Sequence, residues 1–426
     1  MTADTIFALS SGSPPAAIAV VRVSGPRAPA ALEALTGKRP EPRMATLATV
    51  RGAGGERLDT ALALFFPGPA SATGEDVAEL HLHGGRAVVA AVLEALSRIE
   101  GLREARPGEF TRRAFERGRI DLAEAEGLAD LLEAETQSQR RSALAMAGGA
   151  VGRLIGPWRE RLLGLAAGLE AAIDFSDEGE VGEAPPPGWR SALEALVAEI
   201  EAALARPPAE RLREGIRLVI AGPPNAGKSS LLNHLSGREA AITSPSAGTT
   251  RDVIEAPTAI GGTPFLLVDT AGLRDSEDEV EAIGVGRARE SLATADLILW
   301  LGPPADCPAG DRALIIQSRA DIDQPDPAAQ FRVSARTGEG MDALLAAIRE
   351  RAQTLLPNEG DVALNRRQRT AVGDAVAGLH EAGSHKDILL AAESLRAARY
   401  ALDRVTGGAG VEDMLDTLFG RFCIGK

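Results

Sequence analysis

A phosphate-binding loop is written into this chain as Gly222-Pro223-Pro224-Asn225-Ala226-Gly227-Lys228-Ser229-Ser230, which completes the pattern G-x-x-x-x-G-K-[ST]. It directly follows the apolar run 216–221 and precedes a segment with helical spacing. In such a loop, backbone N–H groups surround the α- and β-phosphates, a lysine reaches the β- and γ-phosphates, and a hydroxyl binds magnesium. The pattern therefore predicts a nucleotide site in which Lys228 contacts phosphate and Ser229 binds Mg²⁺.

Two segments further along the chain are typical of a nucleotide switch. In Thr249-Thr250-Arg251-Asp252, a threonine hydroxyl completes the magnesium shell and its N–H contacts the γ-phosphate. In Asp269-Thr270-Ala271-Gly272, Asp269 places a carboxylate near the magnesium ion and Gly272 offers an N–H to the γ-phosphate. A polar loop and a helix cap are simpler readings of the two segments taken singly. The order of all three segments favours the switch.

The base is expected to be guanine. Asp321, in Ser318-Arg319-Ala320-Asp321, supplies the carboxylate that accepts two hydrogen bonds from guanine and so excludes adenine. Many GTPases have Asn-Lys where this chain has Ser318-Arg319, so we expect the shorter serine to tie the loop less firmly. Ser334-Ala335 is typical of the loop whose backbone contacts the guanine carbonyl oxygen.

Hydrolysis needs a group that orients water, and Leu273 occupies the position where a glutamine is common. The acidic segment 275–281 offers carboxylates for this role, although such a run is more often a solvated surface. No arginine finger is evident either. The amide oxygen of Asn225 and oxygens of the 244–249 loop are suited to hold a monovalent cation against the phosphates instead.

Composition bounds the remaining possibilities. The chain has 426 residues, 45% of them hydrophobic, and a net charge of −14, which opposes nucleic-acid binding by the chain alone. No apolar run approaches the roughly 18 residues of a membrane span, and Asp4 stands where a signal peptide would be basic. We therefore expect a cytoplasmic protein that does not associate with a membrane. Two cysteines make no disulfide framework, and His81 and His83 lack the partners that a metal site needs.

The periodicity of apolar residues divides the chain into four segments. Residues 1–118 alternate β-like runs, at 18–23, 62–66 and 79–83, with helical stretches and predict a small α+β domain. Residues 119–210 are helical, 211–356 alternate strands and helices as in a parallel sheet, and 357–426 are helical again. Three apolar stripes carry the helical assignment: Leu122, Ala125, Leu128, Leu132; Leu162, Leu165, Leu169, Ile173; and Leu193, Leu196, Ile200, Leu204. The α/β segment is thus predicted to be inserted into a helical domain.

Several short segments give the chain a family resemblance along its whole length. They are 4–6, 21–25, Thr73-Gly74-Glu75-Asp76, Arg106-Pro107-Gly108-Glu109-Phe110-Thr111, 121–126 and the final Cys423-Ile424-Gly425-Lys426. Together with the phosphate-binding loop, they resemble the MnmE (TrmE) family of tRNA-modification GTPases. The resemblance implies an N-terminal folate-binding domain that forms a homodimer, a helical domain, and an inserted Ras-like P-loop G domain.

The resemblance also implies the chemistry and the partners. Family members act with a flavoprotein, MnmG (GidA), in a heterotetramer or larger complex. Together they place an aminomethyl or carboxymethylaminomethyl group on C5 of the wobble uridine of certain tRNAs, using a one-carbon unit of 5,10-methylene- or 5-formyl-tetrahydrofolate. GTP hydrolysis in the family is activated by K⁺ together with Mg²⁺.

Carried onto this sequence, the resemblance assigns residues to the two metal ions, to catalysis, to folate and to GTP. Potassium ligands are Asn225, Ser244, Ser246 and Thr249, and magnesium ligands are Ser229 and Thr250. Glu281 orients the attacking water, with Lys228 as the second catalytic residue. Folate contacts are Arg22, Glu79, Arg119 and Lys426. The GTP contacts are Asn225, Ala226, Gly227, Lys228, Ser229, Ser230, Ser244, Thr249, Thr250, Asp269, Gly272, Ser318, Arg319, Asp321, Ser334 and Ala335.

Other interpretations stay open at this stage. A ribosome-assembly GTPase of the Era or EngA type shares the Asn-containing loop but adds a basic RNA-binding domain that the acidic composition does not favour. A GTP-gated scaffold without modification chemistry of its own differs only in whether it binds folate. Arg22 and Glu79 could also form a simple surface pair, and Cys423 is either a reactive thiol or a small apolar residue.

Overall fold

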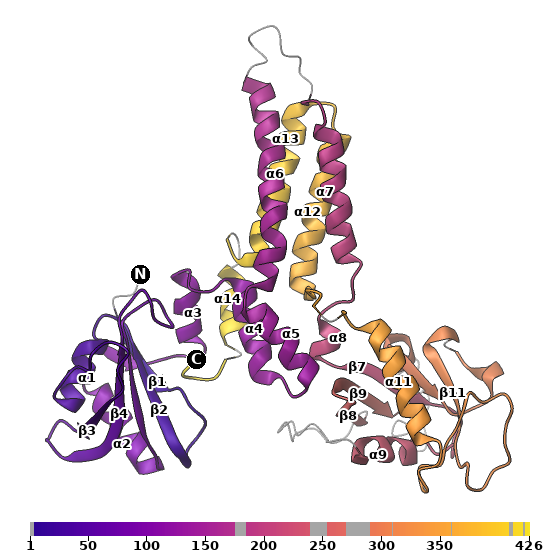
Figure 1. Ribbon diagram of the computed structural model, residues 1–426, viewed down its shortest axis with the longest axis horizontal. Coiled ribbons are helices and arrows are strands. Elements are labelled where there is room, and N and C mark those ends of the chain that lie inside the picture. Colours follow the sequence, from indigo (N-terminus) through magenta and orange to yellow (C-terminus); the bar gives the residue numbers. More distant parts are fainter. Residues whose placement is uncertain are drawn as a thin grey trace, which may run out of the picture. The chain divides into compact units, whose positions relative to one another are not determined.

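The computed structural model of the chain describes residues 4–174, 185–238, 254–269, 290–308, 310–358, 360–408, 412–420 and 422–426 (Figure 1). The chain divides into two compact units, Met1–Ala129 with Thr406–Lys426, and Asp130–Val405. The first unit therefore joins the two ends of the sequence. The domain boundaries expected at residues 118, 210 and 356 stay predictions.

The first unit is built on a six-stranded sheet with the strand order β3-β4-β5-β2-β1-β6. Neighbouring strands are antiparallel apart from β1 and β6, which are parallel. The predicted β-like runs are confirmed as parts of β2, β4 and β5. The strands are β1 (Thr5–Leu9), β2 (Ala16–Ser24), β3 (Thr46–Arg51), β4 (Arg57–Phe66), β5 (Val77–Gly84) and β6 (Leu102–Glu104).

The two faces of this sheet differ. On one face, α1 (Ala28–Thr36) and α2 (Arg86–Ser97) bury alternate strand residues in a continuous core, as period-2 side chains require. On the other face, α3 (Glu109–Glu116) covers β1 with Phe110. That second face, called the open face below, leaves large apolar side chains exposed, namely Ile18, Leu47 and Leu62.

The C-terminal segment belongs to the first unit. α14 (Glu412–Phe419) packs against α3 and α4 (Leu122–Glu133), with the rings of Phe115 and Phe419 6.2 Å apart. Beyond it, Ile424 forms an isolated bridge with Pro107. The predicted stripe on α4 is wrong at one position: Leu132 is 46% exposed, because it lies in the last turn of the helix.

The second unit contains a sheet with the order β12-β11-β10-β7-β9-β8. All pairs are parallel except the edge pair of β8 and β9, so the predicted parallel sheet is confirmed. Helices α9 (Lys228–Arg238) and α11 (Met341–Leu355) pack on one face of it. The strands are β7 (Ile216–Ala221), β8 (Ile254–Ile260), β9 (Thr263–Asp269), β10 (Leu297–Trp300), β11 (Ala313–Gln317) and β12 (Phe331–Arg332). Loops that follow the parallel strands meet at one edge, where ligands bind in such sheets.

Long helices complete the second unit and come from both sides of the α/β segment in sequence (Figure 1). They are α5 (Gln137–Ala147), α6 (Ala150–Asp174), α7 (Trp189–Leu204), the short α8 (Glu210–Arg213), α12 (Arg366–Ser384) and α13 (Ile388–Thr406). The predicted stripes on α6 and α7 are buried except at their ends, where Ile173 and Leu204 are half-buried. The helical assignment of these segments is confirmed.

Candidate nucleotide and folate sites

The phosphate-binding loop connects the end of β7 to the first residue of α9. Gly222 has φ 145°, and a Cβ added there would lie 2.7 Å from the carbonyl oxygen of Leu301, so only glycine fits. Asn225 also has a positive φ, of 60°. The ammonium of Lys228 is buried and donates hydrogen bonds to the carbonyl oxygens of Gly222 (3.1 Å) and Pro223 (2.8 Å). The loop therefore anchors its lysine through its own carbonyl oxygens, at the position from which the lysine of such a loop contacts phosphate.

The predicted magnesium ligand Ser229 meets the predicted carboxylate. Its Oγ donates a hydrogen bond to Oδ2 of Asp269 across 3.0 Å. Ser229 lies in the first turn of α9 and Asp269 is the last residue of β9, with only 1% of its surface exposed. A hydroxyl and a carboxylate are the hard oxygen donors that Mg²⁺ prefers. These two residues fit the ion.

The loop after β11 is held against the phosphate-binding loop. Ser318 Oγ donates to the carbonyl oxygen of Ala226 (2.6 Å), and Arg319 Nη2 donates to that of Asn225 (2.7 Å). Arg319 adopts φ 54°, in the left-handed region that few residues other than glycine occupy. Two predicted base-site residues thus contact two predicted phosphate-site residues.

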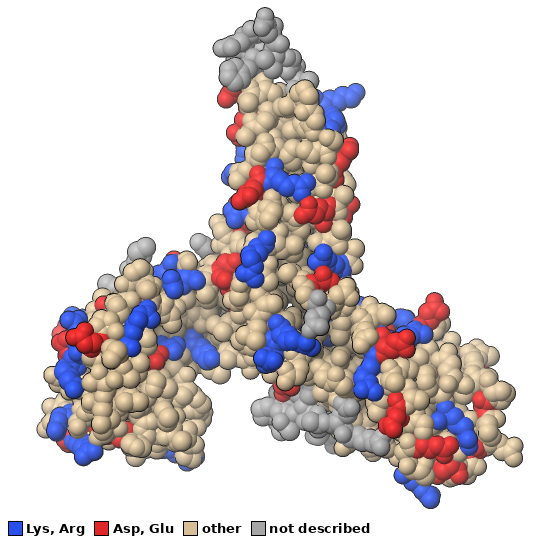
Figure 2. Space-filling model, in the orientation of Figure 1, with Lys and Arg blue, Asp and Glu red and all other residues tan. Residues whose placement is uncertain are grey.

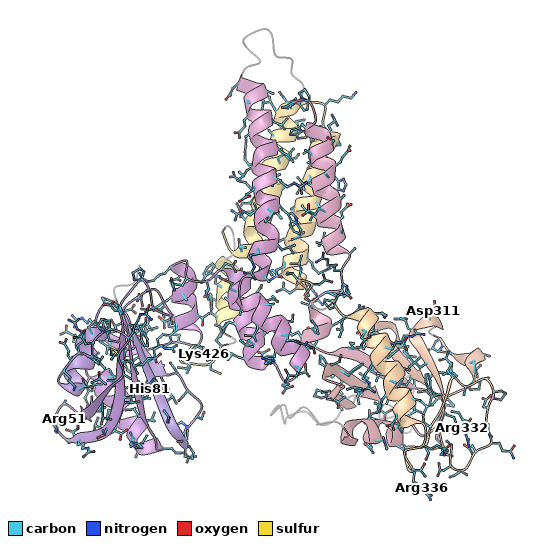
Figure 3. The ribbon with its side chains drawn as sticks, in the orientation of Figure 1. Arg51, His81, Asp311, Arg332, Arg336 and Lys426 are labelled. Carbon is cyan, nitrogen blue, oxygen red and sulfur yellow. The ribbon has the colours of Figure 1, made fainter. Side chains whose placement is uncertain are left out.

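Asp321 is joined to the third loop of the predicted base site. The hydroxyl of Ser334 donates to it, and this hydrogen bond holds the pKa of the Asp321 carboxyl below its usual value, so the group stays ionised. Ser334 is buried and fixed by its own backbone, which bonds to Glu339 and Gly338. Arg336, two residues after Ser334 and labelled in Figure 3, has an 83% exposed side chain, and its Nε lies 3.9 Å from Oδ2 of Asp321. The loops that carry Asp321 and Ala335 therefore lie together.

Several predicted site residues lie outside the described part of the chain. They are Ser244, Ser246, Thr249 and Thr250 in one segment, and Gly272, Leu273 and Glu281 in another. Of the predicted potassium ligands, the structure describes Asn225 alone. The water-orienting role of Glu281 stays a prediction.

Two of the four predicted folate residues form a direct pair. Arg22 on β2 and Glu79 on β5 are cross-strand partners. Nε of Arg22 donates a hydrogen bond of 2.9 Å to Oε1 of Glu79, and Nη2 forms an ion pair with the same oxygen at 2.8 Å. His81 lies 3.3 Å from the same carboxylate and is labelled on the sheet in Figure 3. The guanidinium of Arg22 also stands over the ring of Phe110 at 5.8 Å. The carboxylate and the guanidinium stay partly exposed on the open face of the sheet.

The other two predicted folate residues belong to the same unit as this pair. Arg119 is exposed, and a Cβ on Gly74 would meet its Cγ at 3.1 Å. Lys426 is labelled in Figure 3. It follows Gly425, where an added Cβ would lie 2.0 Å from the carbonyl oxygen of Leu9. Within the described residues, neither side chain makes a hydrogen bond or ion pair with Arg22 or Glu79.

A buried hydrogen-bond network centred on Glu75 was not predicted. Glu75 accepts hydrogen bonds from Ser24 (2.9 Å), Arg113 (3.0 Å) and Arg117 (2.6 Å), and its side chain is 5% exposed. Arg113 also binds Asp4 at 2.9 Å. Arg113 also donates to Glu109 (3.1 Å). Glu75 and Glu109 both lie in segments that carry the family resemblance, which is the signal in the sequence that could have drawn attention to them. Their partners are distant in sequence and could not be paired from it.

The described surface carries charges of both signs. On the face drawn in Figure 2, basic and acidic side chains are interspersed over the described residues. His83 does find a carboxylate, Asp59, at 2.7 Å, but the described residues contain no group of three His, Cys, Asp or Glu side chains placed to hold a metal ion. No described helix combines the length and apolar character needed to cross a membrane.

A phosphate-binding loop at the edge of a parallel sheet, with a buried lysine and a paired serine and aspartate, defines the class of P-loop nucleotide hydrolases. Family models agree and go further. The model described as the MnmE helical domain matches residues 122–423, and the one described as the GTP-binding protein TrmE N-terminus matches residues 5–119.

Known relatives cover the whole chain. The tRNA modification GTPase MnmE of Erythrobacter litoralis is 56% identical over 426 residues, which cover 99% of this chain and 100% of the relative. That of Rhizorhabdus wittichii is 59% identical over 431 residues, which cover 99% and 97%. The chain belongs to the MnmE family of tRNA modification GTPases, and it is accordingly a GTP-binding GTP hydrolase.

Among solved structures, the G domain of the T. maritima FeoB iron transporter covers 32% of this chain and 99% of its own. Its sequence identity is 24% and its TM-score is 0.25, which is too low to support an argument.

Proposed function

We propose that this GTPase is activated by K⁺ and acts with a flavoprotein of the MnmG (GidA) type. The pair would place an aminomethyl or carboxymethylaminomethyl group on C5 of the wobble uridine of certain tRNAs. The observation that carries the hydrolytic half is the 3.0 Å bond between Ser229 and Asp269 beside the buried Lys228. Full-length similarity to MnmE relatives supports the tRNA half.

The residues of the phosphate site have distinct roles in the proposed reaction. Lys228 exchanges its bonds to the Gly222 and Pro223 carbonyls for the β- and γ-phosphate oxygens when GTP enters. Ser229 and Thr250 would hold Mg²⁺, which neutralises charge on those oxygens. Asn225, Ser244, Ser246 and Thr249 would hold K⁺, which supplies the positive charge of the missing arginine finger. Glu281 would orient the attacking water.

The open face of the first unit fits a folate and a second copy of the chain. Leu47, Leu62, His81 and Val20 follow one another across the strands, directly beside the row of Leu64, Glu79 and Arg22. A pterin presents a donor edge that a carboxylate binds in a paired fashion, and the glutamate tail suits Arg22, Arg119 or Lys426. Exposed Ile18, Leu47 and Leu62 supply apolar surface for a homodimer. The tetrahydrofolate would supply the one-carbon unit.

The acidic composition bears on how the proposed complex would reach tRNA. With a net charge of −14, the chain reaches tRNA through the complex with the flavoprotein rather than alone. The proposed location of this complex is the cytoplasm.

Nucleoside analysis tests the modification. Cells that lack this chain should lose the C5-modified wobble uridine, and wild-type chain should restore it while Lys228→Ala should not. Unchanged wobble uridine in the deleted cells would reject the proposal.

Folate binding separates the enzyme from the GTP-gated scaffold. Equilibrium dialysis of 5-formyl-tetrahydrofolate should show binding to the full chain, weakened at least tenfold by Glu79→Ala but not by the exposed Glu41→Ala in the same unit. Absence of binding to the wild-type chain would favour the scaffold.

A further inference from the structure

His234 links the phosphate-binding helix to the predicted base-reading loop. It lies on α9, the helix that begins with Lys228 and Ser229, and its Nδ1 is 2.8 Å from the carbonyl oxygen of Ala335. A carbonyl oxygen only accepts, so Nδ1 carries the proton and donates it. Ala335 follows Ser334, whose hydroxyl is bonded to Asp321.

The second ring nitrogen of His234 is buried and has no hydrogen-bond partner among the described residues. Burying a polar atom without a partner costs free energy, so an apolar side chain would serve better if the position only filled space. The neighbouring positions Leu231, Leu232 and Leu235 are occupied in that way. The bond to Ala335 is what histidine adds here.

That bond fixes the peptide that follows Ala335. Ser334 is already anchored on its other side, by Asp321 and by backbone bonds to Gly338 and Glu339. With both sides fixed, the N–H of Ala335 is held in one direction. Preorganised donors bind a fixed acceptor more tightly than mobile ones.

We propose that His234 is a positioning residue for base specificity, which orients the Ala335 loop so that its backbone N–H reads the 6-oxo group of guanine. The inference rests on the guanine pocket of the proposed function. It makes a prediction that a general structural role does not. Removing the bond should weaken the binding of nucleotides that carry a 6-oxo group and leave the binding of a nucleotide without that group unchanged.

The test compares three nucleotides on the full chain with Mg²⁺. GTP and ITP both carry the 6-oxo group, and 2-aminopurine riboside triphosphate lacks it. His234→Leu should raise the dissociation constants of GTP and ITP about three- to tenfold, the worth of one neutral hydrogen bond, and leave that of the 2-aminopurine nucleotide unchanged. His234→Asn, whose amide nitrogen replaces Nδ1, should restore tight GTP binding.

Asp321→Ala serves as the reference variant, because it should narrow the preference for GTP over ITP by losing the contact to the 2-amino group. Suppose that Asp321→Ala narrows this preference, but His234→Leu raises the dissociation constants of all three nucleotides equally or of none. The role of His234 is then overturned, while the guanine pocket is supported. Equal affinities of the Leu and Asn variants would likewise overturn it. If Asp321→Ala leaves the preference unchanged, the guanine pocket is misplaced and the inference fails with it.

Discussion

The hydroxyl of Ser318 donates a hydrogen bond of 2.6 Å to the carbonyl oxygen of Ala226. It joins the loop after β11 to the phosphate-binding loop, 92 residues earlier in the chain. The sequence predicted a looser tie, because serine is shorter than the usual asparagine. The short side chain reaches because the loops approach closely: a Cβ on Gly227 would lie only 3.4 Å from Ser318 Oγ.

Loss of this bond should weaken GTP binding. Ser318→Ala removes one side-chain hydrogen bond between the two loops, and we expect the dissociation constant of GTP to rise about three- to tenfold. Isothermal titration with GTP and Mg²⁺ measures it. The matched control is Ser191→Ala, which removes a hydroxyl on α7 that donates to the carbonyl oxygen of Gly188. This variant should bind GTP normally. Unaltered affinity in Ser318→Ala would show that Arg319 alone holds the loop.

The Ser229 and Asp269 pair should set the magnesium requirement. Asp269→Asn keeps the shape of the side chain but removes its negative charge, so the Mg²⁺ concentration for half-maximal hydrolysis should rise and the turnover number should fall at least tenfold. A magnesium titration of GTP turnover measures both. Asp311→Asn, at an exposed position of the same unit (Figure 3), should change neither quantity. If GTP turnover by Asp269→Asn depended on the Mg²⁺ concentration as the wild type does, the Asp269 carboxylate would have no role in binding magnesium.

Glu75→Gln should destabilise the first unit. Arg113 is 6% exposed and would lose the charge of its most buried carboxylate partner, although Asp4 and Glu109 remain as partners. Breaking a buried ion pair costs about 3 kcal/mol, which corresponds to roughly 100-fold faster hydrogen exchange of protected amides. Mass spectrometry of peptides from β2 and β5 reports this unit alone. Glu41→Gln, on the surface, should exchange as the wild type does, and equally slow exchange in Glu75→Gln would show that the pair contributes nothing.

Acid should destabilise the same unit through Glu109. Burial raises the pKa of this carboxyl, but hydrogen bonds from Arg103, from the Arg106 N–H and from Arg113 outweigh it and hold the pKa below its usual value. The stabilisation is therefore complete above the unfolded pKa of about 4.3 and is lost as the pH falls through the lower folded value. Urea titrations between pH 3 and 7 should show a flatter pH dependence in Glu109→Gln. Identical curves for variant and wild type would assign the acid sensitivity to other carboxylates.

Local patterns made much of this molecule predictable. The phosphate-binding loop is a contiguous motif, and its lysine bonds to carbonyl groups only a few residues away. The buried strands β7 and β9 end beside it. The periods of strands and helices can be recognised within short stretches of sequence, and the apolar residues that follow them are largely buried in the structure. Leu132, at the end of a helix, is an exception. These features depend on neighbours in sequence.

Contacts between distant residues were not predictable. Arg113 meets Glu75 across 38 residues and the backbone of Asp4 across 109, and His234 meets Ala335 across 101. Nothing in the spacing of these residues distinguishes them from surface charges or from an ordinary helix position. Only the sheet register and the packing of α3 and α9 bring them together.

Turnover of GTP by the purified full chain, measured with Mg²⁺ in KCl and in NaCl, tests the central claim most directly. We predict hydrolysis of GTP but not of ATP, faster in potassium than in sodium, and nearly abolished by Glu281→Ala with GTP binding retained. Equal rates in the two salts would reject the role of potassium. No hydrolysis of GTP in either salt would contradict the account as a whole.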